Sequence, residues 1–196
     1  MAETRYVRSG DAHIAYQVVG SGDLDIVLVP GWFSHVELAW DVPGLTRFIR
    51  GLAQVGRVIL FDKRGTGMSD RVPPDQLPSF EERTEDILAV MDAAGCEQAA
   101  LVGLSEGGTQ SLLAAVRHPD RVRAVAVIGS WARMLEDDGF PIGVSRERLD
   151  ATLARILANW GSGDDIRLFL PSRKDDEQVR TAWATLERRA ASPGAV

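Results

Sequence analysis

The chain has 196 residues, of which 45% are hydrophobic, and its formal net charge is −6. This length and apolar content predict one globular domain with a substantial core. Lys and Arg are scattered among acidic residues, which argues against a nucleic-acid partner. The longest apolar runs are too short to cross a bilayer and no secretory signal is recognisable, so we expect no membrane partner. Because Cys96 is the only cysteine, no intrachain disulfide can form, and we expect a cytoplasmic protein.

The first third of the sequence predicts a hairpin, two buried strands and a helix. Residues 4–8 and 13–19 flank an SGD turn, as the two arms of a hairpin do. Residues 24–30 and 57–62 are rich in Val, Ile and Leu without alternation, which is typical of parallel strands buried on both faces. Between these runs, residues 43–54 predict a helix.

The middle of the chain continues this alternation. Four elements are expected: a helix over 80–94, a strand over 99–104, a helix over 106–117 and a strand over 122–130. Ser79 and Glu82 form a capping-box pattern at the start of the first of these helices, and Pro119 ends the second. The alternation of strands and helices predicts an α/β domain, with a mostly parallel sheet and helices on both faces.

The character of the sequence changes after Trp131. Residues 147–160 and 175–191 have the pattern of amphipathic helices, and no further strand-like run follows. We therefore divide the chain into a sheet-building part, residues 1–131, and a helical cap segment, residues 132–196.

The sequence GLSEGG has the G-x-S-x-G form that presents a nucleophilic serine between a strand and a helix. Such a turn holds Ser105 in a strained conformation, and Cβ atoms at Gly103 and Gly107 would clash. Gly108 lets the following helix pack closely. The alternative is a plain tight turn with a capping serine. In a turn that presents a nucleophile, Ser105 is that nucleophile and requires a base that takes its proton.

A second loop, VPGWF, follows the strand at 24–30. Acyl transfer requires two N–H donors directed at the developing oxyanion. We expect one from the backbone of Glu106 and one from Trp32, because Gly31 permits close approach. Trp32 can also be a core residue, and the two roles are compatible. The residues expected to contact substrate are Gly31, Phe33, His35 and Trp131.

The loop FDKRGTGMSD lies where the carboxyl end of a strand is expected, the edge at which α/β proteins bind ligands. Gly65 and Gly67 predict a tight turn, and we expect Asp62 and Arg64 to brace it through hydrogen bonds and an ion pair. A structural role is favoured over a catalytic one. The phosphate-binding pattern G-x-x-x-x-G-K-[ST] is absent from the sequence.

Three histidines are present. His13 falls in the hairpin and is expected to face solvent, and His118 ends a helix, where its charge suits the helix dipole. His35 follows the VPGWF loop and is expected to line the pocket. No spacing of His or Cys suggests a metal site, so we expect neither a metal nor another cofactor.

The loops VPGW and FDKRGTGMSD, the turn VGLSEGG and the passage RHPDRVRAVAVIGS occur in an order and spacing that resemble the α/β-hydrolase fold superfamily. Residues 4–40 more narrowly resemble a hydrolase-like domain found N-terminal to bacterial class III adenylate/guanylate cyclases and in stand-alone hydrolases. The resemblance implies an esterase-like serine hydrolase acting on a small molecule. The alternative is a non-catalytic ligand-sensing or regulatory domain of a signalling protein.

Compared with this family, the sequence differs in two respects. Its triad runs Ser, then acid, then His, with the acid after the seventh strand and the His after the eighth. This sequence has no counterpart of either, so we expect a sheet incomplete at its C-terminal end and a weakly active or inactive chain. Pro30 stands where many relatives carry His-Gly. An incomplete sheet would leave residues 122–129 as an exposed edge open to self-association.

Overall fold

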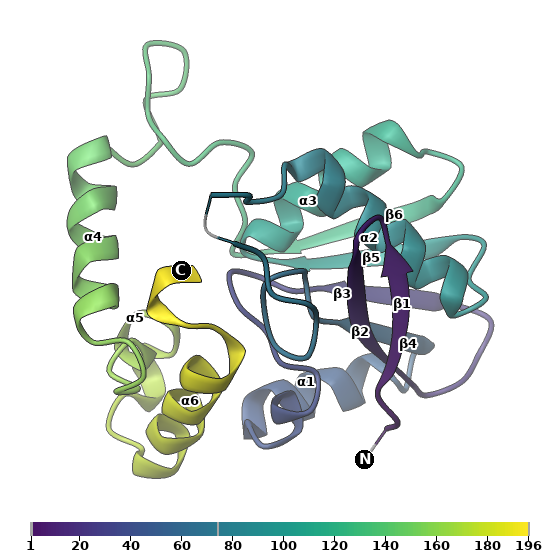
Figure 1. Ribbon diagram of the computed structural model, residues 1–196, viewed down its shortest axis with the longest axis horizontal. Helices are drawn as coiled ribbons and strands as arrows, with labels where there is room; N and C mark the ends of the chain where they lie inside the picture. Colours follow the sequence, from purple (N-terminus) through teal and green to yellow (C-terminus); the bar gives the residue numbers. More distant parts are fainter. Residues whose placement is uncertain (1, 74, 196) are drawn as a thin grey trace.

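The computed structural model describes residues 2–73 and 75–195, which contain one six-stranded sheet of order β1-β2-β4-β3-β5-β6 (Figure 1). The strands are β1 (Arg5–Ser9), β2 (Ala12–Val19), β3 (Asp25–Val29), β4 (Arg57–Phe61), β5 (Ala99–Leu104) and β6 (Val122–Ile128). The first two form the predicted antiparallel hairpin, and β2 pairs antiparallel with β4. The remaining four strands are parallel, as their unbroken apolar runs predict.

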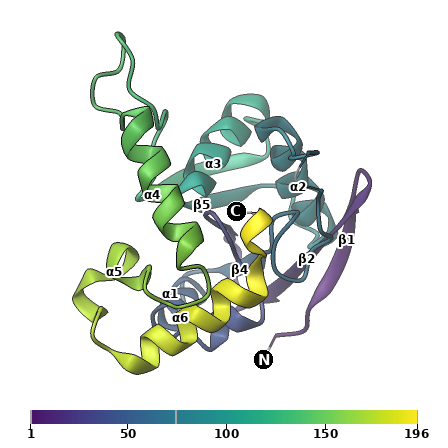
Figure 2. The same ribbon diagram turned by 60° about the vertical axis from the view of Figure 1, so that its left-hand side comes forward.

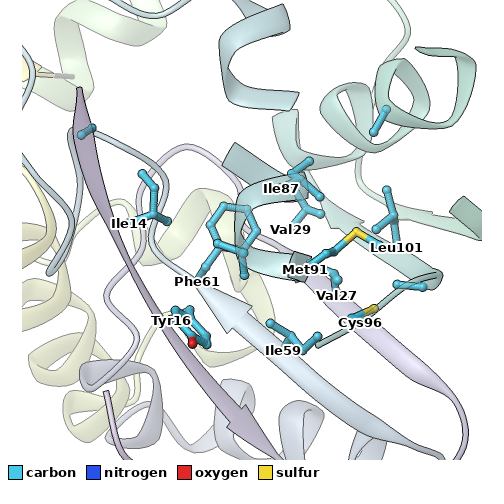
Figure 3. Close-up of a cluster of buried hydrophobic side chains, with 14 residues drawn as sticks. Ile14, Tyr16, Val27, Val29, Ile59, Phe61, Ile87, Met91, Cys96 and Leu101 are labelled. Carbon is cyan, nitrogen blue, oxygen red and sulfur yellow. The ribbon is translucent and has the colours of Figure 1, made fainter. Parts of the chain in front are cut away.

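Three helices cover the two faces of the sheet (Figure 1). Helix α1 (Pro43–Leu52) lies on one face, and α2 (Phe80–Ala93) and α3 (Glu106–Arg117) lie on the other. The capping box expected at the start of α2 is confirmed, because the Ser79 and Glu82 side chains each bond the other's backbone N–H. Each face has its own apolar core, and Figure 3 shows the core on the α2 side, where Ile14, Phe61 and Met91 are buried.

The helical cap consists of α4 (Arg146–Ala158), α5 (Ile166–Phe169) and α6 (Glu177–Ala190). Short 3-10 turns occur at η1 (Leu38–Trp40), η2 (Pro171–Arg173) and η3 (Pro193–Ala195), none of which the sequence predicted. Leu186 of α6 packs against Leu38 and Val42 beside α1. Figure 1 shows α6 next to α1 and α4 farther from the sheet, and in the turned view of Figure 2 α6 again lies next to α1.

The last turn of α6 is also tied to the loop after β4. The Ala190 carbonyl accepts hydrogen bonds from the Gly67 N–H at 2.8 Å and from Arg71 Nη1 at 2.7 Å. This end of the cap is therefore fixed next to the carboxyl edge of the sheet.

One expectation about the strands is wrong. Residues 122–130 were predicted as a strand buried on both faces, but most of β6 is exposed, including Val127 at 49% and Ile128 at 48%. The reason is its position: among the described residues, β6 is the last strand of the sheet and β5 is its one pairing partner. The expectation of an exposed edge over 122–129 agrees with this geometry. None of the described helices has the length and apolarity needed to span a membrane.

Candidate active site

Ser105 stands between the end of β5 and the start of α3 in an unusual backbone conformation. Its φ is 54° and its ψ is −125°, and no other non-glycine residue within 2–73 and 75–195 has a positive φ. This conformation costs about 1–3 kcal/mol and persists only where the surroundings hold it. Here the Ser105 N–H donates to the Ile128 carbonyl at 2.9 Å, and the Gly108 N–H donates to the Ser105 carbonyl at 3.0 Å. The strained serine expected from the sequence is present.

The glycines of the motif leave room for this turn. A Cβ atom at Gly103 would overlap the backbone of Gly108, and one at Gly107 would overlap the carbonyl oxygen of Pro30. A Cβ atom at Gly108 would overlap the Ser130 side chain. The predicted clashes and the predicted close packing of α3 therefore both occur in the structure.

The loop after β3 lies directly against the serine. A Cβ atom at Gly31 would lie 3.1 Å from the Ser105 Cβ, so only glycine allows this approach without displacement. Within the described part of the chain, neither the Trp32 N–H nor the Glu106 N–H donates a hydrogen bond. In the described residues these two N–H groups, one in the loop after β3 and one at the start of α3, are therefore free to donate to another acceptor.

A cavity of about 90 Å³ lies behind this loop. Gly31, Phe33, His35 and Asp62 line it together with apolar side chains of β3, α1 and α6. His35 is half-buried, and burial lowers the pKa of its imidazole, so the neutral form is favoured at neutral pH. Its Nδ1 accepts a hydrogen bond from the Leu38 N–H at 3.4 Å. His35 lines this cavity, and its contact with a substrate stays a prediction.

The other histidines engage acidic partners away from the serine. His13 lies 3.0 Å from Asp70 and is 58% exposed, as expected, and His118 lies 3.4 Å from Glu85 at the end of α3. Among described residues, no histidine forms a hydrogen bond with Ser105. In the same residues, no three His, Cys, Asp or Glu side chains gather closely enough to hold a metal ion.

Aromatic side chains of the cap pack against the loop that follows β3. The Trp160 ring lies 5.8 Å from that of Trp32 and 5.2 Å from that of Phe33. Trp183 of α6 lies 5.6 Å from Phe33. The sequence did not reveal these neighbours. Trp131, predicted to contact substrate, is half-buried after β6, and its carbonyl accepts a hydrogen bond from Thr109 Oγ1.

Asp62 and Arg64 brace the loop after β4, but not through each other. The buried Asp62 Oδ2 accepts from the Val36 N–H at 3.0 Å and the Met68 N–H at 2.9 Å. Arg64 forms its ion pair with Asp86 of α2, at 2.6 Å. Gly65 and Gly67 both have positive φ, and a Cβ atom at Gly67 would overlap the Asp62 carboxylate.

The side chain of Glu106 has a role that the sequence did not indicate. Its Oε1 accepts hydrogen bonds from Lys63 Nζ, from Arg83 Nη1 at 2.8 Å and from Gln110 Nε2 at 3.3 Å. The donors come from the loop after β4, from α2 and from α3. Gln110 is one helical turn from Glu106, but Lys63 and Arg83 are distant in sequence, so no local spacing could have identified these two partners.

The model of the α/β-hydrolase fold family matches residues 26–190 of this chain. The chain belongs to the α/β-hydrolase fold family. This α/β-hydrolase is similar to an esterase (EaEST) from Exiguobacterium antarcticum, with a TM-score of 0.73 at 22% identity, over 98% of this chain and 70% of that one. At this identity the likeness shows the fold alone.

Two relatives are similar in sequence. "Putative carbamate hydrolase RutD" of Azorhizobium caulinodans is 35% identical over 136 residues, which are 69% of this chain and 46% of the relative. "Serine hydrolase BPHL" of Mus musculus is 32% identical over 132 residues, which are 64% of this chain and 42% of the relative. The chain thus matches less than half the length of either relative.

Proposed function

We propose that this α/β-hydrolase is a serine hydrolase of ester-type bonds, with Ser105 as its nucleophile. The observation that carries the proposal is the positive φ of Ser105 between β5 and α3, next to the uncommitted N–H groups of Trp32 and Glu106. Relatives named as a serine hydrolase and a carbamate hydrolase support acyl chemistry at this position.

In the proposed reaction, Ser105 Oγ attacks the substrate carbonyl carbon while a base takes the hydroxyl proton. Negative charge then develops on the carbonyl oxygen, and the Trp32 and Glu106 N–H groups donate to it. Collapse of the tetrahedral intermediate expels the alcohol, which receives the proton from the base. Water attacks the acyl-serine in the same way and releases the acid.

The base determines how fast this chain reacts. Within residues 1–196, His35 is the candidate, because it is the histidine that lines the cavity behind Gly31 and is kept neutral by burial. A positioned general base contributes about two to four orders of magnitude to the rate. Because His35 has no hydrogen bond with Ser105, we expect slow turnover by this chain.

The test is hydrolysis of p-nitrophenyl butyrate by the wild-type chain and by Ser105→Ala. We expect the wild-type rate to exceed the background and the variant rate to fall to it, because the oxyanion donors accelerate only a reaction at Ser105. His35→Gln, measured in parallel, shows whether this imidazole acts as the base. Equal rates for the wild type and Ser105→Ala would exclude Ser105 from the mechanism.

Within residues 2–73 and 75–195 no histidine is hydrogen-bonded to Ser105, which favours a second candidate. This candidate is a non-catalytic domain that binds a small ligand, as in the regulatory part of a signalling protein such as a nucleotide cyclase. The apolar cavity lined by Phe33 is a site for an apolar group. A ligand-induced rise in the unfolding temperature, unchanged in Ser105→Ala and without turnover, would support this candidate.

A further inference from the structure

Next to the serine lies a set of charged side chains that the proposed mechanism does not use. Lys63, Arg83 and Gln110 converge on a single oxygen of Glu106, and we call these four residues the elbow cluster. The Lys63 side chain is 7% exposed, Arg83 is 18% exposed and Glu106 is 20% exposed. The cluster is therefore largely buried but keeps an opening to solvent at Arg83 and Glu106.

The charges of the elbow cluster do not balance. Lys63 and Arg83 carry two positive charges, whereas Glu106 supplies one negative charge and Gln110 is neutral. The N-terminus of α3, where Glu106 is the first residue, adds partial positive charge. The nearby Asp86 does not compensate, because Arg64 holds both of its carboxylate oxygens. One net positive charge thus remains in the elbow cluster.

Hydrogen-bond donors are also in excess. An ammonium group has three N–H donors and a guanidinium group has five. Among the described residues, the Lys63 ammonium and the Arg83 guanidinium each donate one hydrogen bond, both to Glu106. In the same residues, Arg83 Nε is buried and has no hydrogen-bond partner. Burial lowers the pKa of Lys63, because its charged form is less stable there than in water. Buried donors normally have partners, so these donors call for an additional acceptor.

A carboxylate meets both requirements, because it brings one negative charge and up to four acceptor positions. We propose that the elbow cluster binds a carboxylate group, and that the esters cleaved at Ser105 carry one in their acyl part. This inference rests on the proposed function, since Glu106 directly follows Ser105 and supplies one of the proposed oxyanion donors. The substrate class is therefore monoesters of short dicarboxylic acids.

The first test measures binding without catalysis. Sodium acetate replaces sodium chloride at constant ionic strength, and the unfolding temperature of Ser105→Ala is recorded. We expect the unfolding temperature of Ser105→Ala to rise with acetate until the site is saturated. The same rise is expected when Arg180→Gln is added as a control that removes an arginine of the cap. With Arg83→Gln we expect acetate binding to weaken about tenfold, the effect of one lost charge-assisted hydrogen bond. Arg83→Lys, which keeps the charge, should retain part of the response.

Either of two results would overturn the proposal. One is an acetate response that is equal in Arg83→Gln and Arg180→Gln; the other is the absence of a saturable response, which would mean that water alone satisfies the free donors. Should Arg83→Gln fail to fold, as judged by circular dichroism, Lys63→Met serves as the second variant with the same expectation. Because Ser105→Ala is the background, these outcomes do not depend on Ser105 being the nucleophile.

The second test links the site to hydrolysis. The wild-type chain is given p-nitrophenyl butyrate and the mono-p-nitrophenyl ester of succinate, which differ by a carboxylate in place of a methyl group. We expect kcat/KM to favour the succinate ester, and Arg83→Gln to lower the ratio of the two kcat/KM values about tenfold. An unchanged preference in Arg83→Gln contradicts the substrate class, whereas loss of both activities in Ser105→Ala tests the nucleophile separately.

Discussion

A single buried carboxylate holds together the two loops that border the serine. Asp62 accepts one backbone N–H from the loop containing His35 and one from the loop after β4, and its second oxygen is buried without a partner in the described chain. Burial raises the pKa of Asp62 to about 6, and the two N–H donors only partly oppose this shift. The residue that organises the site therefore titrates close to neutral pH.

Asp62→Asn should remove a specific pH dependence of stability. The pKa of about 6 in the folded chain exceeds the ordinary value of 3.8, so the folded state binds the proton more tightly than the unfolded state. The contribution of Asp62 to the free energy of unfolding is therefore fully present below pH ~4. It falls by about 3 kcal/mol in total as the pH rises through about 6. Urea unfolding across this pH range gives the free energy of unfolding of the wild type and of Asp62→Asn. The wild-type value minus the variant value is the contribution of Asp62. Parallel curves for the two chains would contradict the prediction.

The residues of this site that could be predicted from the sequence are those whose conformation is set by their immediate neighbours in the chain. The strained Ser105 and the glycines around it follow from a motif between a strand and a helix, which encodes the turn by itself. The ion pair of Arg64 was expected, but its partner Asp86 was not. The contacts of Glu106 were missed because they join a loop and two helices, and only the folded sheet determines which donors converge there.

At the scale of whole elements, one buried acid of α6 ties the loop after α4 to that helix. Glu187 is 0% exposed, and its Oε2 accepts from the N–H groups of Gly161 and Gly163, both at 3.1 Å. These bonds fix the loop that carries Trp160 onto Trp32. Burial raises the pKa of Glu187, so the acid is retained there at an energetic cost.

Glu187→Ala should release this loop while the sheet stays folded. Two buried N–H groups lose their acceptor, which costs about 3 kcal/mol, so their amide exchange should accelerate about a hundredfold. Hydrogen exchange measured by NMR at Gly161 and Gly163 gives the result. Glu177→Ala, on the exposed side of the same helix, is the matched control, and Glu187→Gln should keep most of the protection. Equal exchange in Glu187→Ala and Glu177→Ala would mean that Glu187 does not hold the loop.

The elements themselves were largely predictable, whereas their contacts were not. Strands β3, β4 and β5 and helices α2 and α3 lie within two residues of the predicted ranges, because apolar runs and caps are local signals. Helices α4 and α6 were expected too, whereas the short helix α5 was not. Their position over Trp32 and Phe33 depends on aromatic residues that are distant in sequence, and periodicity carries no information about such pairs.

At the scale of the whole molecule, the two edges of the sheet differ in how they resist pairing. Strand β1 contains two arginines among five residues, and charged side chains commonly protect an edge. Strand β6, VRAVAVI, contains one charge among seven residues. Next to it, Leu112 and Val116 of α3 are 42% and 79% exposed, which extends the apolar surface beyond the strand. The β6 edge is therefore the surface at which we expect this chain to associate.

We expect the chain to form dimers through β6 at tens of micromolar, because unpaired backbone groups and apolar side chains are exposed together there. Sedimentation equilibrium measures the association. Ala126→Lys places a charge at an exposed position of β6 and should shift the equilibrium toward the monomer, since pairing of two copies would bring like charges close. Tyr6→Lys on β1 is the matched control and should leave the dimer intact. A wild-type chain that sediments as a monomer throughout this range, or equal effects of the two lysines, would exclude β6 as the contact.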